Sequence, residues 1–376
     1  MTEETKHTKG IIRLNAFLWE EISTLGPIPT RRSNHTAICW RDSLLIFGGK
    51  NLSDGQFNDL WLFRIKPHSP DEERWIKLGI VNGPPPICRH SVVLYNQCMY
   101  TFGGIINDES CNSLYVLNFE SMQWNLLVTL NSPNPIDSHT ACLFNNQMII
   151  FGGFIQGNRV NDLYVLNIDT LEWTKKHNRN SPSPRSNHSA CIHSDFMYIF
   201  GGFDDEFYSD LWRLDLHTYE WFPVTPKNDP PIGRSGHSAV VYKNRILIFG
   251  GMKDVGHETN ELFCYDIIKN KWLLLCEEDN SEEMSRISYA ASVFPRRRSK
   301  LVKKRNSSND RSDTKPSLFS SSSWGGYNAK FGRKGCAAPP ARDGHTAVIM
   351  DEQMYIFGGD RHQISFNDLY VLALGS

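Results

Sequence analysis

Apolar runs that end in a pair of glycines recur along the chain. Apolar residues and an aromatic precede each pair, and three successive intervals between pairs are 49 residues. A fixed period of this length indicates a repeat architecture. The runs read LLIFGG ending at Gly49, MYTFGG at Gly104, MIIFGG at Gly153, MYIFGG at Gly202, ILIFGG at Gly251 and MYIFGG at Gly359.

Each repeat holds four short apolar runs separated by turn residues. An Arg-x-x-His start precedes the glycine pair, and an Asn-Asp segment and then a tryptophan follow it. No segment keeps a 3.6-residue period, so each repeat predicts one four-stranded antiparallel sheet, a blade of an all-β propeller. The starts are Arg32/His35, Arg185/His188, Arg234/His237 and Arg342/His345, and the tryptophans are Trp75, Trp124, Trp173, Trp221 and Trp272.

The repeated residues suit the crowded centre of such a ring. A glycine has no Cβ and takes positive φ freely, so it fits where an inner strand ends against the next blade. A tryptophan is a large apolar plate that fills the gap between blades.

The last repeat ends at Leu369–Ala373 without a tryptophan, whereas Phe17–Ile22 offers Trp19 with no blade before it. We therefore expect the N-terminal strand to close the ring, which removes exposed sheet edges.

The number of blades depends on the 108 residues between Gly251 and Gly359. Residues 285–294 align with residues 233–242, and Trp324 follows Tyr289 at the spacing seen in the preceding repeat. This favours seven blades with a degenerate sixth, and the alternative is six blades with an insertion. Residues 1–14 are expected to be a flexible N-terminus, residues 15–376 a single propeller, and residues 295–317 a disordered basic insertion within it.

Composition narrows the class of protein further. The net charge is −1 and no apolar run approaches the roughly 18 residues of a membrane span, so neither a membrane protein nor a globally basic nucleic-acid binder is expected. Residues 1–9 lack the apolar stretch of a secretion signal. Nine cysteines form no Cys-x-x-Cys pair, which favours reduced core thiols in a cytoplasmic or nuclear protein.

One segment is strongly basic. Residues 296–305 contain seven lysines and arginines, and Arg-Arg-Arg-Ser suits a basophilic kinase that would phosphorylate Ser299. A solvated loop, a nuclear-import signal or a contact to an acidic partner are the other readings. Aromatic residues do not interleave with the charges, which argues against nucleic-acid binding.

No enzyme signature stands out in the chain. The recurrent histidines occupy one position per repeat, which favours packing over metal ligation. We find no Ser-His-Asp order, phosphate loop or His-Glu-x-x-His pattern. No enzymatic activity, metal or cofactor is therefore expected.

The glycine pairs and the spaced tryptophans resemble those of the kelch-repeat family over residues 15–373. A looser likeness links the Arg-Arg-Ser start at Arg31 and the late interruption to the kelch region of the leucine-zipper-like transcriptional regulators. The resemblance implies a monomeric propeller that binds a partner protein or peptide on a loop face, as a substrate-recognition adaptor or a scaffold. The alternative is a metal-dependent or other kelch-like propeller enzyme.

The resemblance also implies which positions would contact a partner. In kelch domains that recruit peptides to ubiquitin ligases, the residue after each opening arginine and the residue after each glycine pair face a shared pocket. Ile87 and Ile136 replace the opening arginine in two repeats. An alternative is that the polar residues only hydrate a channel mouth. The partner-binding candidates are Ser33, Lys50, Asp137, Phe154, Arg159, Ser186, Phe203, Asp204, Ser235, Met252, Asp343, Asp360 and Arg361.

Overall fold

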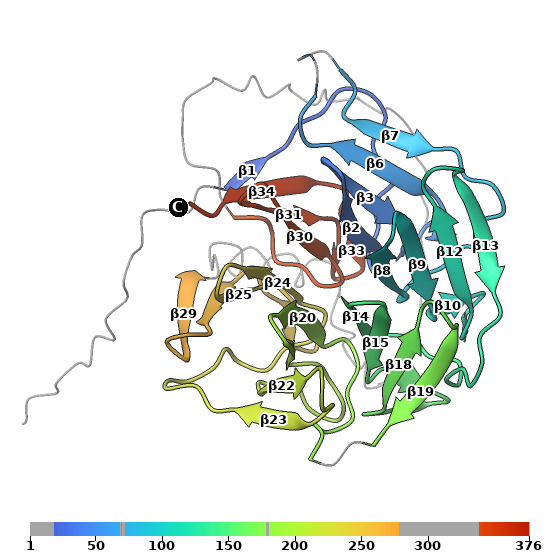
Figure 1. The fold of residues 1–376 in the computed structure, drawn as a ribbon. Coiled ribbons are helices and arrows are strands. Elements are labelled where there is room, and N and C mark those ends of the chain that lie inside the picture. Colours follow the sequence, from blue (N-terminus) through green and yellow to red (C-terminus); the bar gives the residue numbers. More distant parts are fainter. Residues whose placement is uncertain (1–18, 68, 70–71, 178–179, 278–337, 376) are drawn as a thin grey trace, which may run out of the picture. The chain divides into compact units, whose positions relative to one another are not determined.

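The computed structural model describes residues 19–67, 69, 72–177, 180–277 and 338–375, which belong to one compact unit. Six four-stranded antiparallel sheets are arranged around an axis in this part of the chain, and Figure 1 looks along that axis. The architecture is an all-β propeller. The predicted flexible N-terminus 1–14, the basic insertion 295–317 and Ser299 lie outside the described residues.

The first three blades follow each other directly in sequence. Blade 1 contains β2 (Thr36–Trp40), β3 (Ser43–Phe47), β6 (Leu60–Arg64) and β7 (Trp75–Leu78). Blade 2 contains β8 (Ser91–Tyr95), β9 (Cys98–Phe102), β12 (Leu114–Asn118) and β13 (Gln123–Leu127). Blade 3 contains β14 (Thr140–Phe144), β15 (Gln147–Phe151), β18 (Leu163–Asn167) and β19 (Glu172–Lys176).

The other three blades complete the ring. Blade 4 contains β20 (Ser189–His193), β21 (Phe196–Phe200), β22 (Leu211–Asp215) and β23 (Trp221–Val224). Blade 5 contains β24 (Ser238–Tyr242), β25 (Arg245–Phe249), β28 (Leu262–Asp266) and β29 (Lys271–Cys276). Blade 6 contains β30 (Thr346–Met350), β31 (Gln353–Phe357), β34 (Leu369–Ala373) and β1 (Trp19–Glu21).

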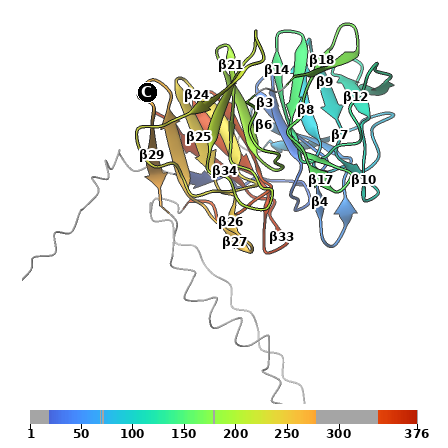
Figure 2. The same cartoon turned by 90° about the horizontal axis from the view of Figure 1, so that it is seen from below.

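Short hairpins follow the glycine pairs of five blades, all on the face that Figure 2 shows at the bottom. We call this side the mouth face. The hairpins are β4–β5 (Lys50–Asn51, Gly55–Gln56), β10–β11 (Ile105–Ile106, Glu109–Ser110), β16–β17 (Phe154–Ile155, Asn158–Arg159), β26–β27 (Met252–Asp254, His257–Glu258) and β32–β33 (Asp360–Arg361, Ile364–Ser365).

The two ends of the propeller meet in blade 6. Strand β1 pairs antiparallel with β34, with Trp19 opposite Leu372. The Trp19 ring lies 5.4 Å from the Phe249 ring of blade 5. This is the contact that the other tryptophans make, since Trp124 of blade 2 lies 5.0 Å from Phe47 of blade 1. The N-terminal strand thus supplies the tryptophan that the last repeat lacks.

The prediction of seven blades was wrong, because blades 5 and 6 are direct neighbours. The inner strands β24 and β30 contact each other, and Ser238 Oγ lies 2.9 Å from His345 Nε2. A hydrophobic cluster that contains Phe249 and Ile356 fills the gap between these blades, so no further blade fits between them. The alternative of six blades with an insertion fits the described ring, and the aligned segment with Tyr289 and Trp324 lies outside the described residues.

The glycine pairs are required because the next blade approaches closely. A Cβ on Gly48, whose φ is +66°, would lie 2.6 Å from the Ile87 carbonyl and 2.8 Å from His90 Cε1. Contacts this short are not tolerated, so a side chain at this position would push the blades apart.

Candidate functional site

Two predicted series of positions come together at the mouth face. In each blade the residue after the opening position pairs with the residue after the glycine pair, and Ser33 and Lys50 exchange two backbone hydrogen bonds of 2.9 Å. The glycine pair turns the chain back toward the blade's own start, which brings these residues together. The six pairs are Ser33–Lys50, Cys88–Ile105, Asp137–Phe154, Ser186–Phe203, Ser235–Met252 and Asp343–Asp360.

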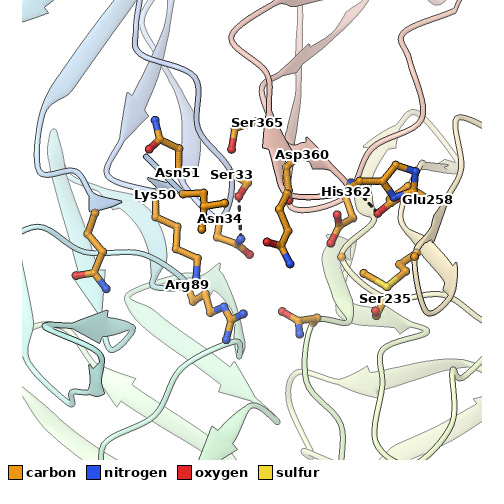
Figure 3. Close-up of a pocket in the computed structure, with 18 of the residues that line it drawn as sticks. Ser33, Asn34, Lys50, Asn51, Arg89, Ser235, Glu258, Asp360, His362 and Ser365 are labelled. Carbon is orange, nitrogen blue, oxygen red and sulfur yellow. Dashed lines mark hydrogen bonds and ion pairs between the residues drawn. The ribbon is translucent and has the colours of Figure 1, made fainter. Parts of the chain in front are cut away.

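A pocket of about 880 Å³ opens at this face, and Figure 3 shows the residues that line it. We call it the mouth pocket. Of the predicted partner-binding residues, six line it: Ser33, Lys50, Ser235, Met252, Asp343 and Asp360. The other seven are not part of its lining: Asp137, Phe154, Arg159, Ser186, Phe203, Asp204 and Arg361.

Sequence reasoning missed several lining residues, among them Arg89, Glu258 and His362. Arg89 was missed because its repeat opens with Ile87 and lacks the arginine that marks the start of other repeats. Glu258 and His362 lie in hairpins whose register with the neighbouring blade is not visible in a repeat pattern. Besides His362, the ionisable lining comprises two basic residues, Lys50 and Arg89, and four acidic ones: Asp108, Glu258, Asp343 and Asp360.

The acidic side of the pocket combines blades 5 and 6. Burial, with the nearby Asp360 and Glu258 carboxylates, raises the pKa of Asp343 to about 8. Burial also raises the pKa of Asp360, against a hydrogen bond with Ser33 and the charge of Lys50. Glu258 is only 4% exposed, and its Oε1 accepts a hydrogen bond from the His362 backbone N–H at 3.2 Å. Carboxylates are therefore crowded together on this side.

A second cluster lies on the mouth face between blades 3 and 4. The Arg159 guanidinium is 4.7 Å from the centre of the Phe203 ring and 5.7 Å from that of Phe154. Asp204 Oδ1 lies 3.7 Å from Arg159 Nη1. Four of the predicted residues are thus brought together as an aromatic and charged patch beside the mouth pocket. By contrast, Asp137 is buried and accepts hydrogen bonds from the Ser110 and Ser138 hydroxyls.

The histidines of the repeats join neighbouring blades. Each Nε2 lies 2.7–2.9 Å from a Ser or Thr hydroxyl of an adjacent blade, as His139 does from Ser91 Oγ. Burial lowers the pKa of His139 to about 3, so its imidazole stays neutral at physiological pH. These histidines, which are His35, His90, His139, His188, His237 and His345, line a narrower channel of about 140 Å³. Their arrangement serves packing between blades.

One residue per blade completes a closed circuit of backbone hydrogen bonds near the axis, which we call the axial ring. Asn34 donates to the carbonyl of Gly344, Arg89 donates to Asn34, and the series continues around the ring at 2.8–3.1 Å. All members have positive φ. The members are Asn34, Arg89, Ser138, Asn187, Gly236 and Gly344. All six line the narrower channel, and Asn34, Arg89, Asn187 and Gly236 also line the mouth pocket.

Within the described residues, no three His, Cys, Asp or Glu side chains are arranged to hold a metal ion. The same residues contain no helix with the length and apolar character needed to span a membrane. Seven cysteines in this part of the chain are free thiols: Cys39, Cys88, Cys98, Cys111, Cys142, Cys191 and Cys264.

The ring of four-stranded blades, with a pocket at one end, defines a β-propeller built from repeats. The model of the KLHDC2/KLHL20/DRC7 Kelch-repeats domain matches residues 3–179 and 138–296. These matches cover more than half of the chain, which therefore belongs to the kelch-repeat family. Propellers of this family are in general protein-interaction modules.

Curated relatives match shorter stretches. The chain is 30% identical over 113 residues to the dynein alpha chain of the flagellar outer arm of Chlamydomonas reinhardtii, which covers 29% of this chain and 2% of the relative. It is 31% identical over 105 residues to the leucine-zipper-like transcriptional regulator 1 homolog of Drosophila melanogaster, covering 26% and 10%. It is 30% identical over 103 residues to kelch domain-containing protein 3 of Homo sapiens, covering 26% and 25%. The chain thus matches a quarter or less of the length of these relatives.

Proposed function

We propose that this propeller is a protein-recognition module whose mouth face binds a partner protein or peptide. The observation that carries the proposal is the mouth pocket, a concave site of about 880 Å³ that hairpins from separate blades build together. A rigid scaffold with irregular loops at one end is a common arrangement for binding sites. The patch of Phe154, Arg159 and Phe203 would extend the contact beside the pocket, since aromatic and arginine side chains dominate binding energy at interfaces.

A role as an adaptor or scaffold, acting as a monomer in the cytoplasm or nucleus, is part of this proposal. Burial raises the pKa of the Cys142 thiol to about 12, and Cys39, Cys88, Cys98, Cys111, Cys191 and Cys264 form no disulfide. Free thiols in this number are typical of a reducing compartment. For the alternative, a metal-dependent propeller enzyme, the described residues offer no metal-binding set.

The test compares two variants with four substitutions each. The mouth variant carries Lys50, Phe154, Phe203 and Arg361 changed to alanine. The control variant carries alanine at Asn146, Asp195, Lys243 and Glu352, which lie in the turns between the two inner strands of their blades, at the opposite end of those strands from the glycine pairs.

Each protein is used for affinity capture from cell extract and for selection of a random heptapeptide phage library. We expect partners and peptides that bind the wild type and the control variant but are lost from the mouth variant. Partners or peptides that the mouth variant retains would show that recognition occurs elsewhere. Circular dichroism and the melting temperature establish that both variants are folded.

A further inference from the structure

The charges of the mouth pocket are unevenly placed. Lys50 of blade 1 and Arg89 of blade 2 lie on one side, whereas Glu258 of blade 5 and Asp360 of blade 6 lie on the other (Figure 3). Asp343 also lines the pocket and is the backbone partner of Asp360 in blade 6. With Asp108, the lining has four acidic against two basic residues. A pocket with low-dielectric walls focuses such a charge, so cations are concentrated in it.

The Glu258 carboxylate is the group that calls for a ligand. The side chain is buried, and its Oε2 accepts no hydrogen bond from any described group. The nearest cationic candidate is His362 Nδ1, 3.3 Å away, which pairs with it only when the imidazole is protonated. A buried carboxylate oxygen without a donor is costly, and a donor from a bound molecule would offset this cost.

The shape of the acidic side selects the kind of cation. Within the described residues these carboxylates do not converge as a metal-binding set, so a small divalent ion is not what they fit. A guanidinium or ammonium group on a flexible stem carries several donors that reach acceptors spread over a wider area. Backbone at Ser33 and Asp343 is already paired within the protein, so the side chains are left to make the contacts.

We propose that the mouth pocket binds an arginine or lysine side chain of a partner polypeptide, with its cationic group held among Glu258, Asp343 and Asp360. This inference rests on the proposed function and adds the chemistry of the ligand. Arg89 opposes such binding, because its positive charge acts on Asp343 and would repel a bound cation. Its side chain is 37% exposed, and its nearest acidic partner, Asp137, is 3.9 Å away.

The probe is a fluorescent tetra-arginine peptide, measured by anisotropy beside a tetra-citrulline peptide of the same shape without charge. We expect the arginine peptide to bind the full chain at least about tenfold more tightly than the citrulline peptide. Glu258→Gln, Asp343→Asn and Asp360→Asn should each weaken binding about three- to tenfold. Asp195→Asn, which removes the same charge from an exposed turn, should leave the affinity unchanged.

Free arginine amide and spermine are tested as competitors. Competition by either at a concentration equal to that of the peptide would assign the site to small cations instead of a polypeptide.

Arg89→Gln gives a result that damage to the fold could not produce, since it should tighten binding about threefold.

The affinity should also rise between pH 6 and pH 8.5, because a cation binds more tightly when the Asp343 carboxyl is ionised. The charged groups that surround Asp343 are Asp360, Glu258, Arg89, Lys50 and His362. Equal binding of the arginine and citrulline peptides would overturn the inference. If the phage selection still yields peptides that require the mouth face but no basic residue, the proposed function stands and only the inference fails.

Discussion

The six blades begin in two different ways. In blades 1, 4, 5 and 6 a fully buried arginine opens the repeat, and Arg342 donates to both oxygens of Asp368 at 2.6 and 2.9 Å and to the Gly358 carbonyl at 2.8 Å. In blades 2 and 3 the same position is an isoleucine, 1% exposed, that packs in a hydrophobic cluster. Both kinds of blade have the same four strands and the same backbone contacts with their neighbours.

In the two blades without the arginine, the acidic residue is either replaced or paired with another cation. Blade 2 has Ser113 where blade 6 has Asp368, and in blade 3 Asp162 pairs with Lys175 at 2.8 Å instead. A buried ion pair and a packed apolar side chain are therefore alternative ways to fill one site. The comparison teaches that the arginine and its acidic partner are a local pair and are not required by the propeller itself.

Breaking one partner of the ionic opening should have the largest effect. Arg342→Ala leaves the Asp368 carboxylate, 17% exposed, without its cation and the Gly358 carbonyl without a donor. We expect the free energy of unfolding to fall by about 3–5 kcal/mol, measured by urea denaturation. Lys269→Ala, which removes an exposed cation next to Asp266, serves as the control and should cost less than about 1 kcal/mol. A loss of similar size in both variants would contradict the assigned role of Arg342.

Shortening the apolar opening should cost somewhat less. Ile136→Ala removes buried methyl groups from the cluster between blades 2 and 3 and leaves a cavity, so we expect a loss of about 2–4 kcal/mol. Ile268, which is 73% exposed, offers the matched control, and its change to alanine should stay within about 0.5 kcal/mol. If Ile136→Ala lowered the free energy of unfolding no more than Ile268→Ala does, the Ile136 side chain would not anchor the apolar opening.

Exchanging one opening for the other should have the smallest effect. Arg342→Ile combined with Asp368→Ser gives blade 6 the residues of blade 2, including the Asn-Ser-Leu-Tyr order at 367–370. We expect this double variant to lie within about 1.5 kcal/mol of the wild type, well below the loss in Arg342→Ala. A double variant that is as unstable as Arg342→Ala would show that the two openings are not interchangeable, and the comparison would fail.

These regularities explain what the sequence could and could not reveal. The glycine pairs and tryptophans predicted the blades, because close approach and gap filling recur at every interface between blades. Trp19 predicted how blade 6 is completed by the N-terminal strand. The blade number was wrong because a local likeness around Tyr289 and Trp324 says nothing about whether β24 and β30 touch, which they do.

The site was harder to predict than the fold. The positions after the opening residue and after the glycine pair follow the repeat, so Ser33, Lys50 and Asp343 could be named. Glu258 could not, because it comes from the return strand of a hairpin in blade 5, and its approach to His362 of blade 6 depends on the angle between two blades. Sequence repeats report what the blades share, whereas the pocket is built from what they do not share.

The axial ring has an electrostatic consequence. In an α-helix the peptide dipoles align along a line, and partial charges accumulate at its two ends. In the axial ring the hydrogen bonds follow one another around a circle, from Asn34 through Gly236 and Gly344 back to Asn34. A circle of dipoles has no end, so their components around the circle cancel and no partial charge accumulates along this circuit as it does at a helix end. Whether the pocket attracts a cation or an anion is therefore left to a few side chains, and a kelch propeller can reverse its preference by changing them without disturbing its centre.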